Sequence, residues 1–160
     1  MSVREALVER LLRAGMTVAT AESCTGGAVA AAIVSVAGAS AVFPGAVVSY
    51  TEEIKHRLLG VPLTLIREKG VVSTEVALAM AQGARRALGA DLAVSTTGLA
   101  GPGGGSPALP VGTVCIAVSG EAGFACFTEH FSGDREQIRG AATESALVHL
   151  LEYLDTQRVF

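Results

Sequence analysis

Short apolar runs that alternate with amphipathic segments are the feature that most constrains how this chain folds. Three of the runs are rich in β-branched or small apolar residues and predict buried strands: Met16 to Ala21, Ala46 to Tyr50 and Leu92 to Thr97. The segments around them are predicted to be helical, Thr51 to Arg57 as a charged helix start and the others chiefly from their apolar residues: Val3 to Ala14, Ala28 to Val36, Thr51 to Arg57, Thr64 to Lys69 and Thr74 to Leu88. Strands that alternate with helices predict an α/β sandwich with parallel strands.

The C-terminal part of the chain predicts a hairpin followed by a helix. Gly112 to Ser119 and Gly123 to Phe131 have strand character and flank a short turn. Asp134 then begins an amphipathic helix that reaches about Leu154, and Asp134 with Gln137 has the pattern of a capping box. The hairpin requires at least one antiparallel strand, so a mixed sheet is expected. No repeat, linker or low-complexity segment divides the chain, which predicts a single domain over all 160 residues.

Composition and charge argue against several classes of protein. Half of the residues are apolar and 17% are charged, which suffices for a sizeable core and excludes a disordered chain. A net charge of -3 and the absence of tryptophan argue against nucleic-acid partners. The N-terminal segment is charged and helical and lacks the apolar core of a signal peptide. We therefore expect a cytoplasmic protein that does not bind nucleic acid.

The potential metal-ligating residues show no motif. Cys24, Cys115 and Cys126 form no Cys-x-x-Cys pair, so neither a disulfide framework nor a zinc site is predicted. No His, Cys, Asp or Glu cluster has the spacing of metal ligands. Any catalysis is therefore expected to proceed without a metal or another cofactor.

One uncharged stretch is long enough to cross a bilayer. No charged residue occurs between Glu22 and Glu52. The stretch is mostly Ala, Gly, Ser and Val, however, and it is interrupted by Gly38, Pro44 and Gly45. Ala and Gly gain little from transfer into lipid. A buried helix followed by a buried strand is therefore expected, and no membrane span.

Three polar segments follow the predicted parallel strands. They are Glu22 to Gly27, Tyr50 to Lys55 and the glycine-rich stretch Gly98 to Ser106. Ligands of open α/β sheets bind outside the carboxyl ends of the parallel strands, where these segments would meet. Their convergence predicts a ligand site at that edge of the sheet.

The first of these segments places Ser23, Cys24 and Thr25 between a strand and a helix. A hydroxyl at such a turn can act as a nucleophile, with the turn amides as an oxyanion hole. Ser23 or Thr25 can equally serve as a simple helix cap, and Cys24 is a rival nucleophile. Glu22 stays open between a substrate contact and a structural role.

The other segments also allow two interpretations each. Lys55 can act as a base beside a hydroxyl if burial lowers its pKa, or it can be a solvated side chain next to a strand-end Tyr50. The Gly98 to Ser106 loop can present amides to an anion or merely connect two strands. Arg135 can bind a phosphate, although its neighbourhood also suits helix capping.

Taken together, the motifs are more specific than any one of them. Their sequences are Ala-Glu-Ser-Cys-Thr-Gly-Gly at 21–27, Val-Ser-Tyr at 48–50 with Lys55, Gly-Leu-Ala-Gly-Pro at 98–102, Pro-Val-Gly-Thr-Val at 110–114 and Phe-Ser-Gly-Asp-Arg at 131–135. In this combination the chain resembles the CinA C-terminal domain family, from about Glu5 to Leu154. The turn at 21–27 and the loop at 98–102 are the most specific elements.

The resemblance implies a fold, an activity and a set of residue roles. Stand-alone members are nicotinamide mononucleotide deamidases, with a three-layer α/β/α sandwich, a mixed and mostly parallel five-stranded sheet, and a homo-oligomeric state, here a dimer or trimer. The small-molecule substrate would be a nucleotide. Mapped by motif, Ser23 would be the catalytic serine with Tyr50 and Lys55 as partners. Substrate would be bound by a further set of residues: Glu22, Cys24, Thr25, Gly26, Gly98, Ala100, Gly101 and Arg135.

Two positions depart from the family pattern. Members often carry Asn where this chain has Glu52, and Lys where it has Leu109. Glu52 would add negative charge near the site, and Leu109 would remove a cation that could help to bind phosphate. A non-catalytic nucleotide-binding module, acting through partners in competence or DNA-damage physiology, is the alternative function.

Overall fold

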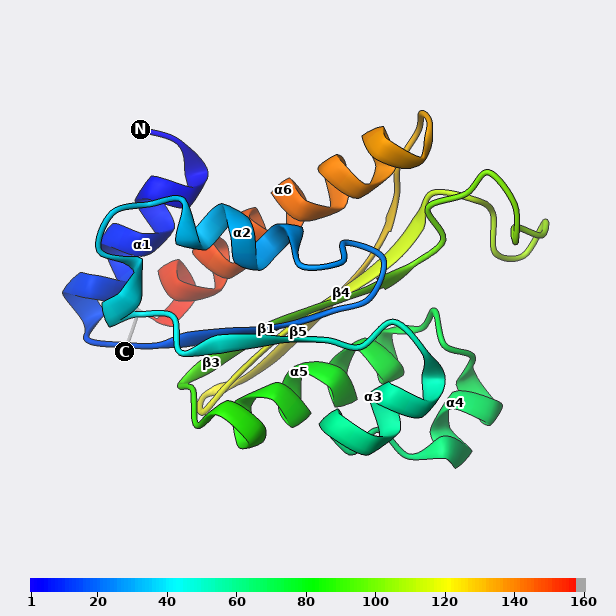
Figure 1. Cartoon of the computed structure of the whole chain (residues 1–160), viewed down its shortest axis with the longest axis horizontal. Helices are drawn as coiled ribbons and strands as arrows, with labels where there is room; N and C mark the ends of the chain where they lie inside the picture. The colour runs from blue at the N-terminus through cyan, green and yellow to red at the C-terminus, as the bar shows by residue number, and fades with distance from the viewer. Residues whose placement is uncertain (158–160) are drawn as a thin grey trace.

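A five-stranded sheet forms the middle layer of the protein in the computed structural model, which describes residues 1–157 (Figure 1). In chain order the strands are β1 (Val18–Glu22), β2 (Gly45–Val48), β3 (Leu92–Gly98), β4 (Thr113–Gly120) and β5 (Gly123–His130). Their spatial order is β2-β1-β3-β4-β5. β1 is parallel to β2 and β3, whereas β4 is antiparallel to both β3 and β5. Only β4 therefore runs against the other four strands.

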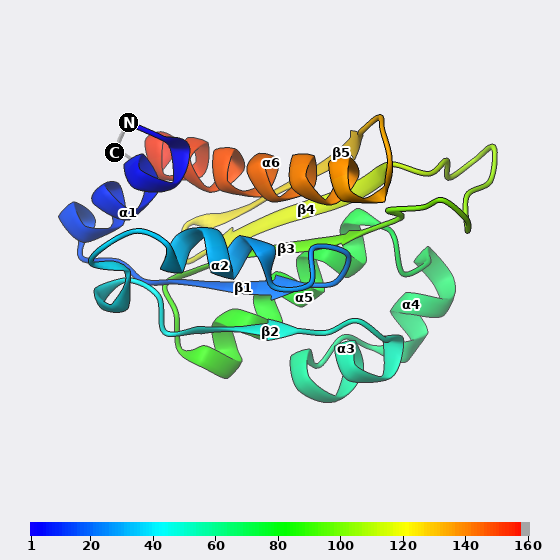
Figure 2. The same ribbon diagram turned by 45° about the horizontal axis from the view of Figure 1, so that its top comes forward.

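Helices cover both faces of the sheet (Figure 2). One layer consists of α1 (Val3–Ala14), α2 (Ala28–Val34) and α6 (Arg135–Thr156). The other consists of α3 (Glu52–Leu59), α4 (Leu63–Lys69) and α5 (Thr74–Leu88). A short 3-10 helix, η1 (Ala39–Ala41), precedes β2. This arrangement confirms the α/β/α sandwich with a mixed five-stranded sheet that the sequence and its family resemblance predicted.

The strands separate two apolar cores because their side chains alternate between the two faces. Valine and isoleucine side chains such as Val18, Val94 and Ile116 face α1, α2 and α6. The opposite face carries small side chains, including Ala19 and Ala93, against α5. Small residues let the α5 helix approach the sheet closely, which explains why so much of this apolar chain is alanine.

The uncharged stretch between Glu22 and Glu52 folds into several short elements. It contains α2, η1 and β2, and α2 has only seven residues. No helix formed by residues 1–157 is both long enough and apolar enough to span a bilayer.

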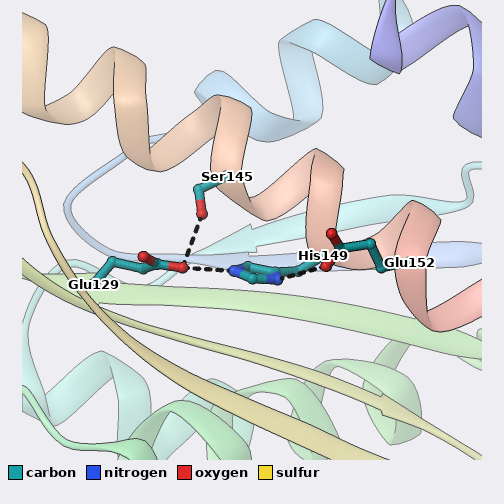
Figure 3. Close-up of polar contacts among 4 residues, drawn as sticks. All are labelled: Glu129, Ser145, His149 and Glu152. Carbon is teal, nitrogen blue, oxygen red and sulfur yellow. Dashed lines mark hydrogen bonds and ion pairs between the residues drawn. The ribbon is translucent and has the colours of Figure 1, made fainter.

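A polar cluster joins the edge strand β5 to α6 (Figure 3). One ring nitrogen of His149 lies 2.7 Å from a Glu129 carboxylate oxygen, and the other lies 3.3 Å from Glu152. Ser145 also donates a hydrogen bond to Glu129, and the His149 ring stacks on Phe127 with centroids 3.6 Å apart. These contacts hold α6 across the sheet, and the N-terminus of α6 carries Arg135.

Candidate active site

A cavity of about 350 Å³ opens at the carboxyl ends of β1 and β3, where the sequence predicted a ligand site. Its walls come from the turn after β1, the start of α3, the segment before α5, the loop after β3 and the N-terminus of α6. Figure 1 shows that the loop between β3 and β4 extends well beyond this end of the sheet. The N-terminus of α6 contributes Arg135. The lining residues are Ser23, Cys24, Tyr50, Thr51, Glu52, Lys55, Val71, Val72, Thr97, Gly98, Leu99, Ala100, Gly101, Gly103 and Arg135.

Ser23 is the first residue after β1 and lies at the floor of the cavity. Its amide donates a hydrogen bond to the Thr96 carbonyl at 3.0 Å, so the sheet hydrogen bonding continues to the serine. Gly26 and Gly27 then adopt left-handed backbone conformations, with φ of 60° and 102°, that reverse the chain into α2. Ser23 is 8% exposed, which leaves its hydroxyl accessible only from the cavity.

Lys55 is the principal partner of Ser23. Thr51 caps α3 by accepting a hydrogen bond from the Ile54 amide, which places Lys55 in the first turn of the helix, pointing back at the sheet. The Lys55 Nζ donates to Ser23 Oγ at 2.8 Å and to the carbonyls of Ser49 at 2.7 Å and Tyr50 at 3.3 Å. Its side chain is only 1% exposed. Among residues 1–157 the ammonium group therefore has three acceptors and no carboxylate partner within hydrogen-bonding distance.

Burial makes Lys55 a usable base. It lowers the pKa of the Lys55 ammonium from 10.5 to about 8, and the carboxylate of Glu52 opposes this shift without cancelling it. When Lys55 is neutral, two N–H groups can stay on the two carbonyls while the lone pair faces Ser23 Oγ. The pair therefore has the geometry of a nucleophile and its general base.

Cys24 lines the cavity beside Ser23 but is poorly suited to be the nucleophile. Burial raises the pKa of its thiol to about 11, so the thiolate is scarce near neutral pH. Among residues 1–157 the Cys24 amide donates to no backbone carbonyl. An amide next to a nucleophile is the position used for an oxyanion hole.

Tyr50 and Arg135 meet on the other side of the cavity. The Tyr50 hydroxyl accepts a hydrogen bond from Arg135 Nη2 at 3.1 Å, and Arg135 Nη1 donates to the Gly101 carbonyl at 2.8 Å. Tyr50 contacts Lys55 through its backbone carbonyl and not through its hydroxyl. The structure therefore differs from the expectation that the Tyr50 hydroxyl works together with Lys55, since the guanidinium group holds that hydroxyl elsewhere.

Glu22 and Thr25, which the family resemblance assigned to substrate binding, do not line the cavity. Both side chains are fully buried. The Glu22 carboxylate accepts hydrogen bonds from the hydroxyls of Thr20 and Thr25, at 3.0 and 2.7 Å. It also accepts from the amide of the N-cap residue of α2 and from two amides in the first turn of that helix. It thus satisfies the donors of a helix start that has no side-chain cap. Glu22 shapes the turn that presents Ser23.

The other residues that were expected to bind substrate fall into two groups, those that line the cavity and those that lie outside it. Gly98, Ala100 and Gly101 line the cavity, whereas Gly26 lies outside it, and a side chain there would meet Arg139. Leu109 also lies outside the cavity wall and packs partly against the core beneath α5.

Sequence reasoning missed several residues of the site. Arg139 donates hydrogen bonds to the carbonyls of Cys24 at 2.9 Å and Thr25 at 3.0 Å, and so fixes the turn from outside. It lies four residues after Arg135 on the same helix face, and this spacing was the available signal. Val71 and Val72 line the cavity from a segment that carries no motif, so nothing in the sequence pointed to them.

No group of three His, Cys, Asp or Glu residues within the described part of the chain is arranged to hold a metal ion. The candidate site is therefore built from a serine, a lysine, an arginine and backbone amides.

A three-layer α/β/α protein with a buried serine–lysine pair at the carboxyl edge of its parallel strands is the class that this fold and site define. Residues 1–154 match the sequence family described as the CinA C-terminal domain. The chain belongs to this family.

Relatives in the curated collection carry the name CinA-like protein. One from Geobacter metallireducens is 52% identical over 141 residues, which cover 88% of this chain and 34% of the relative. One from Citrifermentans bemidjiense is 48% identical over 159 residues, covering 97% of this chain and 38% of the relative. The chain thus spans about a third of the length of the curated relatives it matches.

Solved structures agree with this assignment over nearly the whole chain. A competence-damaged protein (CinA) superfamily protein from Klebsiella pneumoniae has a TM-score of 0.93 at 32% identity, with 96% of both chains covered. The competence/damage inducible protein CihA from Agrobacterium tumefaciens has a TM-score of 0.89 at 38% identity, with 97% of both chains covered. These relatives share the fold described above.

Proposed function

We propose that the protein is an amidohydrolase that converts nicotinamide mononucleotide to nicotinate mononucleotide and ammonia. The observation that carries the proposal is the 2.8 Å contact between Ser23 Oγ and the buried Nζ of Lys55. A site that only binds a nucleotide has no need for a buried amine beside an accessible hydroxyl. The family resemblance supplies the substrate, and the chemistry of the cavity supports the reaction type.

Acylation begins at Ser23. Neutral Lys55 takes the hydroxyl proton as Ser23 Oγ attacks the carboxamide carbon, and the carbonyl oxygen becomes an oxyanion. The Cys24 amide, which donates to no backbone carbonyl among residues 1–157, would donate a hydrogen bond to that oxygen. Lys55 then returns the proton to the amide nitrogen, the C–N bond breaks, and ammonia leaves a Ser23 ester.

Deacylation repeats these steps with water. Lys55 takes a proton from a water molecule that attacks the ester carbon, and the proton returns to Ser23 Oγ as the C–O bond to the enzyme breaks. The products are a carboxylic acid and the regenerated serine. Each step needs only the nucleophile, one base and an oxyanion donor, all of which line the cavity or its floor.

The rest of the cavity suits the nucleotide. Its volume of about 350 Å³ is within the range of small-molecule sites. Arg135 carries the cationic group that a 5′-phosphate requires, and the loop from Gly98 to Gly103 adds backbone amides. We assign the Tyr50 hydroxyl to orienting Arg135 rather than to proton transfer, because the two groups are hydrogen-bonded.

The two departures from the family pattern have different weights in this proposal. Glu52 lines the cavity, and its charge raises the pKa of Lys55 against the effect of burial. Leu109 does not line the cavity, so the absence of a lysine there leaves Arg135 as the cavity's phosphate-binding cation. Glu52→Asn is therefore expected to lower the pKa of Lys55 further, so that the rate of hydrolysis levels off at a lower pH.

Ammonia release from nicotinamide mononucleotide in the presence of EDTA tests the proposal. The parent protein should release ammonia, whereas Ser23→Ala should not, and Ser49→Ala serves as the matched control. Release by Ser23→Ala would remove Ser23 as nucleophile and make Cys24 the next residue to test. No release by the parent protein, while the nucleotide still raises the melting temperature, would instead support the non-catalytic binding module.

A further inference from the structure

A second cavity, of about 470 Å³, lies at the end of the sheet opposite to Ser23. It is enclosed by the last turns of α5 and by the turn between β4 and β5, which Figure 1 shows at the far end of the sheet from the β3–β4 loop. The residues around it are Gln82, Arg85, Arg86, Ala90, Ser119, Gly120, Gly123 and Phe124. β3 begins at Leu92 near this cavity and ends at Gly98 in the first, so roughly 20 Å of strand separates the two.

Two arginines face this cavity without an anionic partner. Neither Arg85 nor Arg86 has a carboxylate within ion-pair distance among residues 1–157. The Nε of Arg85 is buried and has no hydrogen-bond acceptor in the same part of the chain. An anion in the cavity would contact the terminal nitrogens of the two guanidinium groups, which can form parallel hydrogen bonds to a phosphate.

The nearby carboxylates do not account for these arginines. Asp91 accepts hydrogen bonds from the amide and the hydroxyl of Thr17 through Oδ2, and it forms no ion pair with either arginine. Glu121, in the β4–β5 turn, forms no ion pair with either guanidinium. Arginines in the last turn of a helix do interact favourably with its dipole, but this does not explain an unsatisfied buried Nε.

An aromatic surface completes the cavity. Phe124 is 61% exposed at the start of β5, beside the glycines of the turn. Nothing lies within 4 Å of the position that a Cβ of Gly123 would occupy, so a planar group can approach the backbone there. Gln82 and Ser119 add neutral polar side chains at the same wall. Two cations beside an exposed ring suit a phosphate joined to a flat, aromatic base.

We propose that this cavity is a second binding site, separate from the Ser23 cavity, that takes a phosphorylated compound with a planar ring, such as a nucleotide. Arg85 and Arg86 would bind the phosphate, and the ring would stack on Phe124. The proposal is independent of the amidase reaction, because it uses none of the residues that line the first cavity.

Titration calorimetry with AMP and with inorganic pyrophosphate tests this site. Every protein used should carry Arg135→Ala, so that phosphate binding in the Ser23 cavity is weakened throughout. In this background we expect saturable AMP binding, at least tenfold weaker after Arg85→Ala with Arg86→Ala. A control that removes the same charge from exposed positions, Arg57→Ala with Arg67→Ala, should bind AMP unchanged.

Phe124→Ala separates the ring from the phosphate. It should weaken AMP binding about tenfold and leave pyrophosphate binding unchanged, since only the base is expected to stack. The proposed site would be overturned if the two double variants lost AMP affinity equally. It would also be overturned if the Arg135→Ala protein bound no AMP at millimolar concentration. The stacking of the ligand ring on Phe124 would be overturned if AMP bound no tighter than pyrophosphate and if Phe124→Ala left AMP binding unchanged. None of these results depends on whether the protein releases ammonia.

Discussion

Lys55 Nζ lies 2.8 Å from Ser23 Oγ, although the two residues are 32 positions apart and come from different layers. The contact depends on β1 and β2 lying side by side, since Ser23 follows β1 and Lys55 lies in the helix that follows β2. Val48 is the register partner of Glu22, so the two strands end at the same level. The parallel pairing of two short strands thus brings the serine hydroxyl and the lysine amine together.

Ser23→Ala should abolish amide hydrolysis while Ser49→Ala should not. Loss of a nucleophile that acts as a unit with its base costs about 10³-fold or more in kcat/KM. Ser49 is buried close to Lys55, but its hydroxyl has no hydrogen-bond partner among the described residues. Ser49→Ala should therefore stay within about threefold of the parent and keep or slightly raise the unfolding free energy. Steady-state assays of ammonia release measure kcat/KM for both variants. Equal losses of kcat/KM in the two would show a merely structural effect.

The pH dependence of kcat/KM should follow the titration of Lys55. Only the neutral amine can accept the Ser23 proton, and burial lowers the pKa of Lys55 to about 8. The rate should therefore rise about tenfold per pH unit below pH 8 and level off above it. Measurement from pH 6 to 9.5 on the parent protein is sufficient. A profile that falls across this range would contradict Lys55 as the base.

Lys55→Met should change stability in a pH-dependent way. The folded protein holds the pKa of Lys55 at about 8 and the unfolded chain at 10.5, so between these values the unfolded state binds the additional proton. The unfolding free energy of the parent therefore rises with pH in this window, by about 3 kcal/mol in total, and Lys55→Met lacks this rise. Urea unfolding of both proteins at pH 7 and pH 10.5 measures the difference. A gap between the two proteins that does not change with pH would contradict the buried ammonium.

Much of the fold could be predicted because it depends on local patterns. The capping box of Asp134 and Gln137, the bounds of α5 and the hairpin all follow from residues near in sequence. The predicted strand from Ala46 to Tyr50 ends earlier, at Val48, because the chain must turn before Thr51 caps α3.

The errors at the site have a common physical origin. Glu22 could not be assigned from spacing, since its role depends on where the start of α2 lies relative to the end of β1. The partner of the Tyr50 hydroxyl and the role of Arg139 depend on α6 crossing over residues more than 80 positions earlier in the chain. Such long-range contacts are set by the packing of layers, which no motif records.

Glu22→Gln should destabilise the protein although Glu22 does not line the cavity. Five donors converge on its carboxylate, and a glutamine would place an NH₂ group against some of them. Buried donors left unsatisfied cost about 1–3 kcal/mol each, so a loss of about 3 kcal/mol is expected. Urea unfolding should show it, while Glu9→Gln, which removes only an exposed ion pair with Arg13, should cost less than about 1 kcal/mol. An unchanged stability for Glu22→Gln would refute its role in forming the turn.

Gly83→Ala should impair both stability and catalysis through α3. A Cβ on Gly83 in α5 would lie 2.0 Å from the Leu59 carbonyl oxygen at the end of α3, so the two helices would have to separate. Because α3 carries Lys55, this separation should draw the base away from Ser23. We expect a loss of about 3 kcal/mol in unfolding free energy, as for other overpacked sites, together with a lower kcat.

Gly140→Ala is the matched control for this prediction. Gly140 is also a helix residue, in α6, and nothing lies within 4 Å of the position that its Cβ would occupy. Replacing it should stabilise the protein by up to about 1 kcal/mol, because alanine is the better helix former. Thermal unfolding and ammonia release, measured on both variants, separate the two effects. If Gly83→Ala behaved like Gly140→Ala, the close α3–α5 contact could not be what positions Lys55.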